Sequence, residues 1–130
     1  MCVLIESSGT FQTDWRRLYA KRIAEEMNML EFGVKAIYLV GSVESYSAGM
    51  GSDIDLIIKL VGDSKPKESL VVWLRSWEER LCEISGQYTS ESLPYVLDIH
   101  FVNNKDIQNQ SSFAIRMEST VEPPELLRIV

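Results

Sequence analysis

Three of the six aspartates in the chain interrupt apolar, β-type runs, where aspartate is rarely found. Asp53 and Asp55 alternate with isoleucine and leucine, and Asp98 lies in the run VLDIHF. Carboxylates that converge at neighbouring strand edges repel one another, and a divalent cation is the natural compensation. Ligand sets made only of oxygen favour Mg²⁺ or Mn²⁺ over zinc. The three aspartates therefore predict a Mg²⁺ or Mn²⁺ site.

A glycine-serine pair, Gly41 and Ser42, directly follows an apolar run that ends at Val40. Glycine lets backbone N–H groups approach a ligand closely, and a short helix opening after Ser42 would direct free N–H groups at an anion. Taken alone, a glycine-serine pair is typical of an ordinary turn. Here ten residues separate it from Asp53, and this combination predicts an anion site beside the metal site.

The stretch GSVESYSAGMGSDIDLII resembles the signature of the nucleotidyltransferase superfamily that includes DNA polymerase beta, in its small stand-alone form, the minimal nucleotidyltransferase. In that signature a Gly-Ser pair follows the first strand, an Asp-x-Asp lies on the second strand, and one more Asp lies on a later strand. The Ser-Asp-x-Asp-Leu core, residues 52–56, is among its more specific parts, and the resemblance covers about residues 35–102. The matching residues are Gly41, Ser42, Asp53, Asp55 and Asp98.

The resemblance implies a metal-dependent transfer of a nucleoside monophosphate from a nucleoside triphosphate, such as ATP, to a hydroxyl acceptor. Asp53 and Asp55 would hold two Mg²⁺ ions, and Asp98 would complete one metal site and act as the base toward the acceptor hydroxyl. The nucleotide phosphates would be bound by residues around the glycine-serine pair and the start of the second strand: Gly41, Ser42 and Ser52.

The sequence departs from the family pattern in the spacer after Gly41 and Ser42. Many relatives carry an arginine there, whereas this spacer has a glutamate, Glu44, and no cation. Metal, backbone, Lys35 or Lys59 would then have to meet the phosphate charge, and weak triphosphate binding is expected. His100, the only histidine, shares a strand face with Asp98 and is interpreted either as a hydrogen-bonded bystander or as a proton relay.

Hydrophobic periodicity predicts the elements that position these residues. We expect helices over residues 13–32 and 67–85, with Thr13 as N-cap, Gly33 and Gly86 at the helix ends, and a short helix around residues 113–118. We expect strands over residues 36–40, 53–61 and 95–102, and a weak C-terminal element after the paired prolines. Asp14, Asp63 and Asp106 are assigned to helix starts or turns. The order predicts an α/β (α+β) domain, with a small mixed sheet flanked by helices.

Length, charge and cysteine content set limits on the function. The 130 residues predict one domain over residues 1–130, with a net charge of −6 that argues against a broad nucleic-acid surface. We expect no secretory leader and no membrane span, because no basic segment precedes the short apolar run at the start and no apolar stretch is long enough to cross a membrane. Cys2 and Cys82 are interpreted as reduced thiols, so a cytoplasmic protein is expected.

Three functions remain open from the sequence. The first is nucleotidyl transfer to a protein, an RNA end or a small molecule, with a protein partner or a homodimer completing the acceptor site that so short a chain leaves unbuilt. The second is a catalytically weak or inactive antitoxin or regulatory partner of a small helical toxin-like protein. The third is nucleotidylation of an antibiotic, although enzymes of that kind usually carry an additional helical domain.

Overall fold

The computed structural model describes residues 9–89, 93–108 and 124–130. A mixed four-stranded sheet in the order β3-β2-β1-β4 forms its centre. β1 (Val34–Val40) pairs antiparallel with both β2 (Ile54–Leu60) and β4 (Glu125–Ile129), whereas β3 (Leu97–Val102) lies parallel to β2. The predicted α/β class, with a small mixed sheet flanked by helices, is confirmed.

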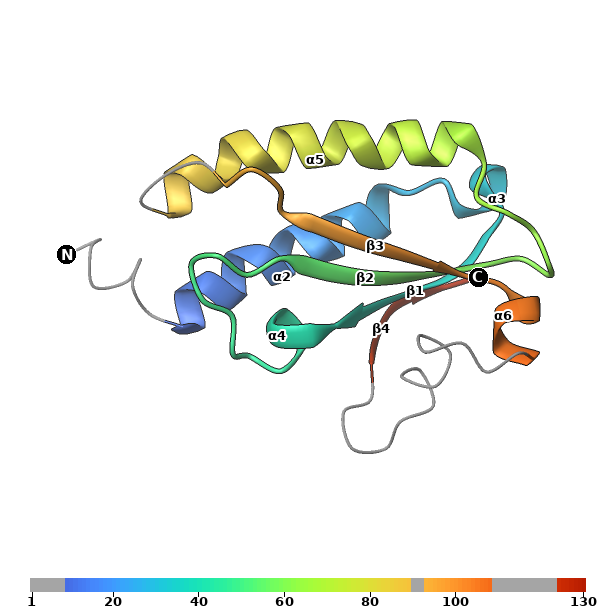
Figure 1. Ribbon diagram of the computed structural model, residues 1–130, viewed down its shortest axis with the longest axis horizontal. Coiled ribbons are helices and arrows are strands. Elements are labelled where there is room, and N and C mark those ends of the chain that lie inside the picture. The colour runs from blue at the N-terminus through green and yellow to red at the C-terminus, as the bar shows by residue number, and fades with distance from the viewer. Residues whose placement is uncertain (1–8, 90–92, 109–123) are drawn as a thin grey trace.

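Two long helices cover one face of this sheet (Figure 1). They are α2 (Gly9–Glu26) and α5 (Glu68–Tyr88), and α5 makes the crossover between the parallel strands β2 and β3. The short helix α4 (Gly41–Glu44) follows β1 directly, and α6 (Asn104–Gln108) follows β3. Among the described residues, no helix is both long and apolar enough to cross a membrane.

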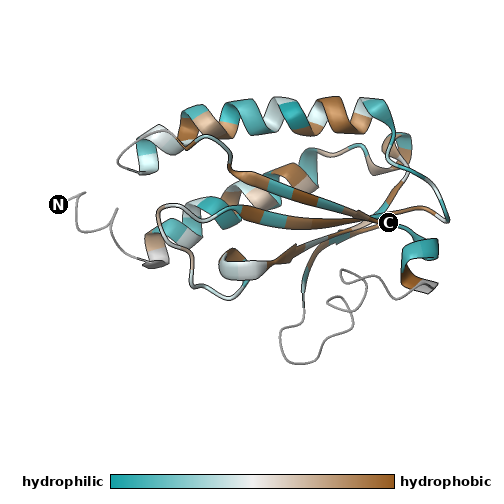
Figure 2. Ribbon diagram, in the orientation of Figure 1, coloured by the Kyte–Doolittle hydropathy of each residue, from teal (hydrophilic) through white to brown (hydrophobic). Residues whose placement is uncertain are grey.

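The core lies between these two helices and the sheet. Alternate residues of β2, Leu56 and Ile58, point into it and are fully buried, and Figure 2 shows the apolar bands along the strands. Aromatic rings close the layer: Trp15 stacks on Tyr88 with centroids 5.2 Å apart and an interplanar angle of 12°. A second, smaller cluster on the opposite face contains Val40, Ile57 and Val102, with Ile107 of α6 packed against it.

The helix predicted over residues 13–32 is present, but both of its ends were predicted wrongly. α2 already includes Gly9, so Thr13 and Asp14 lie inside it, and buried Thr13 accepts a hydrogen bond from Ala48 N–H at 3.3 Å. Near Glu26 the helix stops, and Arg128 Nη1 donates to the carbonyl oxygens of Ala24 and Met27, both at 2.8 Å. A separate turn, α3 (Met29–Phe32), follows.

This break changes which side chains are buried. Leu18 and Leu30, both within the first predicted helix, are 47% and 81% exposed. Leu30 lies in α3, which restarts the helical phase after Asn28, whereas the buried side of α2 includes Trp15, Ala20 and Ile23. Gly33 ends α3 in the left-handed conformation at φ 68°, as predicted.

The remaining elements agree more closely with the sequence. The predicted strands are confirmed to within two residues at most ends, and Asp63 and Asp106 lie at a turn and a helix start as expected. α5 continues past Gly86 to Tyr88, because Gln12 Nε2 donates to the Tyr88 carbonyl oxygen at 3.0 Å. The weak C-terminal element is the strand β4. The helix expected around residues 113–118 lies outside the described residues.

Candidate functional site

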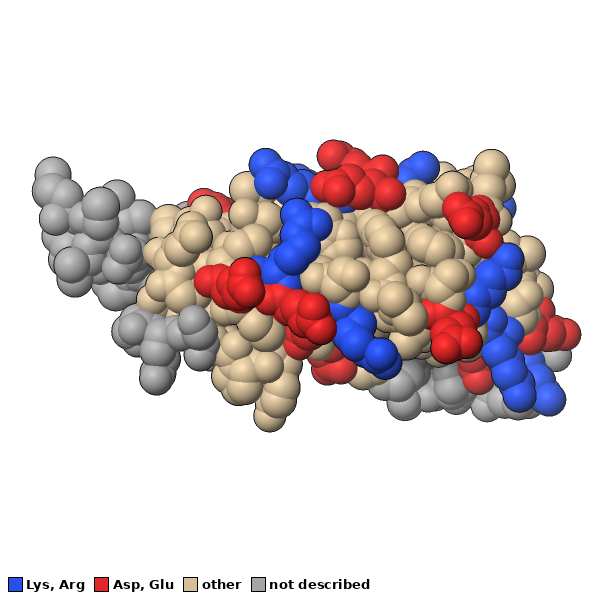
Figure 3. Space-filling model, turned by 90° about the horizontal axis from the view of Figure 1, so that it is seen from above, with Lys and Arg blue, Asp and Glu red and all other residues tan. Residues whose placement is uncertain are grey.

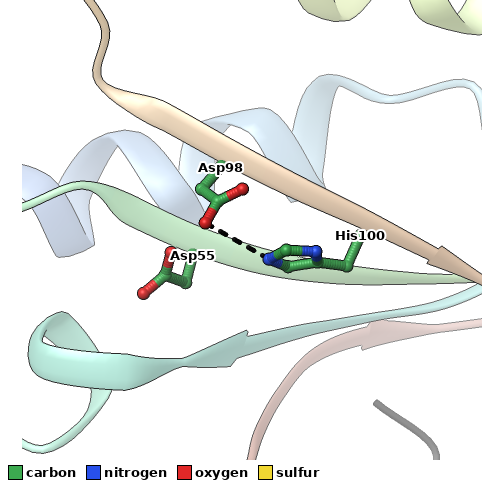
Figure 4. Close-up of side chains that lie close together, drawn as sticks. All are labelled: Asp55, Asp98 and His100. Atoms are coloured by element: carbon green, nitrogen blue, oxygen red, sulfur yellow. Dashed lines mark ion pairs between the residues drawn. The ribbon is translucent and has the colours of Figure 1, made fainter. Parts of the chain in front are cut away.

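Asp55 and Asp98 face each other across the parallel strands β2 and β3. The register pairs Asp55 with Asp98 and Ile57 with His100, so all three polar side chains point to the face away from α2 and α5 (Figure 4). One ligand atom from each of Asp55, Asp98 and His100 lies within 4.8 Å of the others. His100 Nε2 is 3.3 Å from Asp98 Oδ2. The predicted pairing of Asp55 with Asp98 is therefore present, and His100 joins it.

Asp53 lies one residue before β2 and outside the group of ligand atoms that lie within 4.8 Å of one another. Burial raises the pKa of its carboxyl group, and the charge of Asp98 raises it further, while Arg16 opposes both. A raised pKa means that the protein disfavours the ionised form of Asp53 when nothing else neutralises it. The part of this shift that comes from Asp98 is one that a divalent cation at the carboxylates would offset.

Gly41 connects β1 to α4 directly beside Asp55. Its φ of 81° lies in the left-handed region, which disfavours side chains. A β-carbon placed on Gly41 would collide with Asp55 Oδ2 and approach its Cγ to 3.2 Å. Glycine is therefore needed twice, for its conformation and for the close approach of the carboxylate. The short helix predicted after the glycine-serine pair is present as α4.

The spacer between Ser42 and Asp53 is shaped by its own hydrogen bonds. The carbonyl oxygen of Ser42 accepts from Ser47 N–H at 2.8 Å, and Ser52 Oγ accepts from Gly49 N–H at 2.9 Å. Tyr46 has φ 60°, an unusual left-handed conformation for a residue with a side chain. Ser52, predicted to bind nucleotide, thus also has a role in folding the loop.

Arg16 of α2 lies beside the site and is not among the candidate residues that the sequence predicts. Its side chain is fully buried, and it donates from Nε to the Ser52 carbonyl oxygen at 2.9 Å and from Nη2 to the Met50 carbonyl oxygen at 2.8 Å. Burial lowers the pKa of Arg16 to about 10, and the charge of Asp53 opposes that shift. Arg16 therefore attaches the loop that carries Asp53 to α2.

Arg17 brings a cation to the spacer that has none of its own. Its guanidinium lies 4.6 Å from the Tyr46 ring centroid, and Nη2 donates to both carboxylate oxygens of Glu125 at 2.7 Å. Burial lowers the pKa of Arg17, but the hydrogen bond and charge of Glu125, with smaller contributions from Tyr46 and Glu44, raise it overall. Gln12 and Arg16 are buried but polar, so the apolar periodicity of the sequence gives no signal that this side of α2 is buried.

The described residues also line an apolar cavity of about 280 Å³, but it lies on the other face of the sheet. Leu97, Ile99 and Phe101 of β3 line it, and these alternate with Asp98 and His100 along the strand. The cavity is thus separated from the carboxylates by the sheet itself. Lys59, left open by the sequence, is on the carboxylate face but pairs with Val102 at the far end of β3.

Comparison with known proteins identifies the family. A solved structure from Sulfolobus solfataricus, assigned provisionally as a nucleotidyltransferase, is similar over 78% of this chain and 80% of that chain, with a TM-score of 0.44 and 15% identity. Among curated proteins, none matches the sequence at a significant level. The family model of the nucleotidyltransferase domain matches residues 20–121, which include both strands that carry the aspartates. This chain belongs to the nucleotidyltransferase domain family.

Proposed function

We propose that this protein transfers a nucleoside monophosphate from a nucleoside triphosphate, most simply ATP, to a hydroxyl acceptor, using a divalent metal held by Asp53, Asp55 and Asp98. The observation that carries the proposal is the contact between Gly41 and Asp55. The backbone that would bind the phosphates runs directly against a carboxylate that would bind the metal. Phosphate and metal would therefore meet at one point, as this chemistry requires.

The donor set fits a divalent cation. Asp55 and Asp98 present carboxylate oxygens at the same level of two adjacent strands. The pKa of Asp53 is raised first by burial and then by the charge of Asp98, and a divalent cation would offset the second of these. When bound, the metal would supply positive charge to the attacking and leaving oxygens. Oxygen donors of this kind are compatible with Mg²⁺ or Mn²⁺.

The chain's own residues would position the reactants. Backbone N–H groups at Gly41 and Ser42 would bind the phosphates, with Ser52 nearby in the spacer, since the first N–H groups of a helix have no partner within it. The side chain of Asp98 is 48% exposed, so an acceptor hydroxyl can reach it. The acceptor oxygen would bond to the α-phosphorus, its proton would pass to Asp98, and pyrophosphate would leave with the electrons of the broken bond.

An experiment with ATP labelled at the α-phosphate tests this proposal. The protein would be incubated with the nucleotide, Mg²⁺ or Mn²⁺, and acceptors of three classes: RNA ends, small polyols and a co-purifying protein. We expect label transfer that is lost in Asp53→Asn and Asp55→Asn. Asp63→Asn is the matched control, because Asp63 lies in an exposed turn. Label transfer that survives both substitutions at the site would contradict the proposal.

A second function is supported by the charge of the spacer. Arg17 is the cation that lies over the spacer residue Tyr46, and its Nη2 is already bonded to Glu125. Weak triphosphate binding is consistent with a catalytically weak or inactive domain that regulates a small helical toxin-like protein by forming a complex. This function would be favoured by a stable co-purifying partner whose toxicity is suppressed equally by the wild type and by the double variant Asp53→Asn, Asp55→Asn. Loss of suppression would favour the enzyme.

A further inference from the structure

The cluster that the structure assembles differs from the one that the sequence predicts in one ligand. Asp55 and Asp98 were expected, but the third group within 4.8 Å is the imidazole of His100. His100 comes from β3, two residues beyond Asp98, so the alternation of a strand puts both on one face. The cluster offers one nitrogen and two carboxylates (Figure 4).

The neighbours of His100 hold its ring in place. The residue opposite it on β2 is Ile57, which is fully buried, and the residue two positions along β3 is Val102, which is also buried. The side chain of His100 is consequently only 21% exposed, less than half the exposure of Asp98. Its Nε2 is directed at Asp98 Oδ2. A partly buried ring with fixed orientation loses little freedom when it binds a metal.

We propose that Asp55, Asp98 and His100 form a mixed oxygen and nitrogen site that binds a first-row transition metal such as Mn²⁺ in preference to Mg²⁺. The chemical reason is the donor set. Imidazole is a borderline ligand that suits transition metals, whereas Mg²⁺ demands oxygen ligands and gives up its water reluctantly. The inference rests on the proposed function only in assuming that this face of the sheet binds a metal.

The competing interpretation is that His100 only orients Asp98 through a hydrogen bond. The two are distinguished by His100→Gln, whose amide keeps a donor toward Asp98 and replaces the imidazole nitrogen by an oxygen ligand. His100→Phe keeps a ring and removes both properties. A positioning residue would affect all divalent metals alike, whereas a ligand would affect the choice between them.

The first measurement is metal binding without nucleotide. Free Mn²⁺ is counted by its electron paramagnetic resonance signal, and Mg²⁺ is added as the competitor. We expect the wild type to prefer Mn²⁺, and we expect this preference to fall on the order of tenfold or more in both variants. Circular dichroism would verify that the variants are folded. A preference that stays within about twofold of the wild type in both variants would overturn the proposal.

The second measurement observes the ligand atom itself. Because His100 is the only histidine in the chain, its ring nitrogens give the only imidazole ¹⁵N resonances, with no need for assignment by mutation. Zn²⁺ serves as a diamagnetic transition-metal probe. We expect Zn²⁺ to move the Nε2 resonance strongly and Mg²⁺ to leave it nearly unchanged. A ring that responds to neither ion, while Mn²⁺ binds, would exclude His100 as a ligand.

These outcomes separate the inference from the proposed function. If no divalent ion binds to the wild type, the metal site and the metal-dependent transfer both fail. If Mn²⁺ and Mg²⁺ bind with equal affinity and His100→Gln changes nothing, the inference fails while Asp53, Asp55 and Asp98 keep their proposed roles. Preference for Mn²⁺ that depends on the imidazole, together with a shift at Nε2, supports the mixed site.

Discussion

The two faces of the sheet are built from the same strands and serve different purposes. On β2, Leu56 points toward the two long helices and is completely buried. Asp55, one residue earlier, borders Gly41 and points to the opposite face, which carries Asp98 and His100 and is called the open face below. On β3 the same alternation separates Ile99, which lines the apolar cavity, from His100. A step of one residue along a strand changes the face. Stability and chemistry are therefore encoded in alternate positions of the same short segments.

The coverage of the two faces differs as well. Aromatic residues of α2 and α5 seal the helix-covered face, where Trp73 and Trp77 meet edge to face at 6.3 Å and Tyr19 joins them. Seen from the α5 side, basic and acidic side chains are interspersed over the surface (Figure 3). Among the described residues, the open face has only the small cluster around Ile57 and Val102. The face with less packing is the one that carries the cluster of Asp55, Asp98 and His100.

The largest effect that tests this contrast comes from two adjacent residues. Leu56→Ala should lower the free energy of unfolding by about 3 to 4 kcal/mol, because it removes a fully buried side chain from the core. Asp55→Asn should change the stability by less than about 1 kcal/mol in the absence of metal, since the site is polar and partly open. Urea unfolding followed by circular dichroism measures both.

The same two substitutions should also differ in their effect on metal binding. Leu56→Ala should retain metal binding under folding conditions, whereas Asp55→Asn should lose it. The comparison fails if the two substitutions have the same effect on unfolding, or if Leu56→Ala removes metal binding while the variant remains folded.

The next largest effect concerns the residue that connects the two faces. Arg16→Met should lower the free energy of unfolding by about 2 to 3 kcal/mol, because the carbonyl oxygens of Met50 and Ser52 lose charged donors. It should also raise the pKa of Asp53 further, since Arg16 is the group that opposes the shift. Carboxyl resonances followed through a pH titration measure that change.

Arg22→Met is the control for Arg16→Met, because Arg22 lies on the exposed side of the same helix. It should leave both the unfolding free energy and the Asp53 titration unchanged. An Arg16→Met variant with wild-type stability would mean that the spacer does not depend on α2.

The sequence predicts most of the strand pattern of the open face, because the motif itself depends on strand alternation. Asp55 and Asp98 meet because β2 and β3 are parallel and in register, an arrangement that the predicted order of elements does not specify. His100 could be placed on the correct face but not within reach of Asp55, because the distance depends on strand register. Register is set by pairing partners that a single sequence does not reveal.

On the helix-covered face, the burial of charged side chains was harder to predict than the strand pattern. The sequence gives no sign that Arg16 and Arg17 are buried, because buried arginines are rare and their partners are backbone oxygens and a glutamate far away in the chain. The partner of Arg17, Glu125, is 108 residues distant. β4 was predicted only as a weak C-terminal element, for a related reason: five residues after a proline pair carry little periodicity, and their strand character comes from pairing with β1.

A smaller effect is expected at the contact between Gly41 and Asp55. Gly41→Ala should lower the free energy of unfolding by about 1 to 2 kcal/mol, because alanine is strained at φ 81°. Since the new methyl group would also displace the Asp55 carboxylate, metal binding should weaken more than stability. Isothermal titration with Mn²⁺ and urea unfolding measure the two losses.

Gly49→Ala is the matched control for Gly41→Ala, since Gly49 lies in the same loop region and nothing lies within 4 Å of an added β-carbon. It should leave metal binding unchanged. Equal loss of metal binding in both alanine variants would mean that the contact between Gly41 and Asp55 is not what matters.

The smallest expected effect tests whether the helix-covered side lacks reactive groups. Burial raises the pKa of the Cys82 thiol, and the charge of Glu78 adds to the shift. A raised pKa lowers the thiolate fraction at pH 8, so iodoacetamide should modify Cys82 roughly several-fold more slowly than an exposed cysteine. In a Cys2→Ser background, Cys82 supplies the only thiol. The reference is Ser64→Cys, in an exposed turn, with Cys82→Ser added. Equal rates would show that the thiol on α5 is as available as a surface group, and the contrast between an inert face and a chemical face would then hold only for the carboxylates.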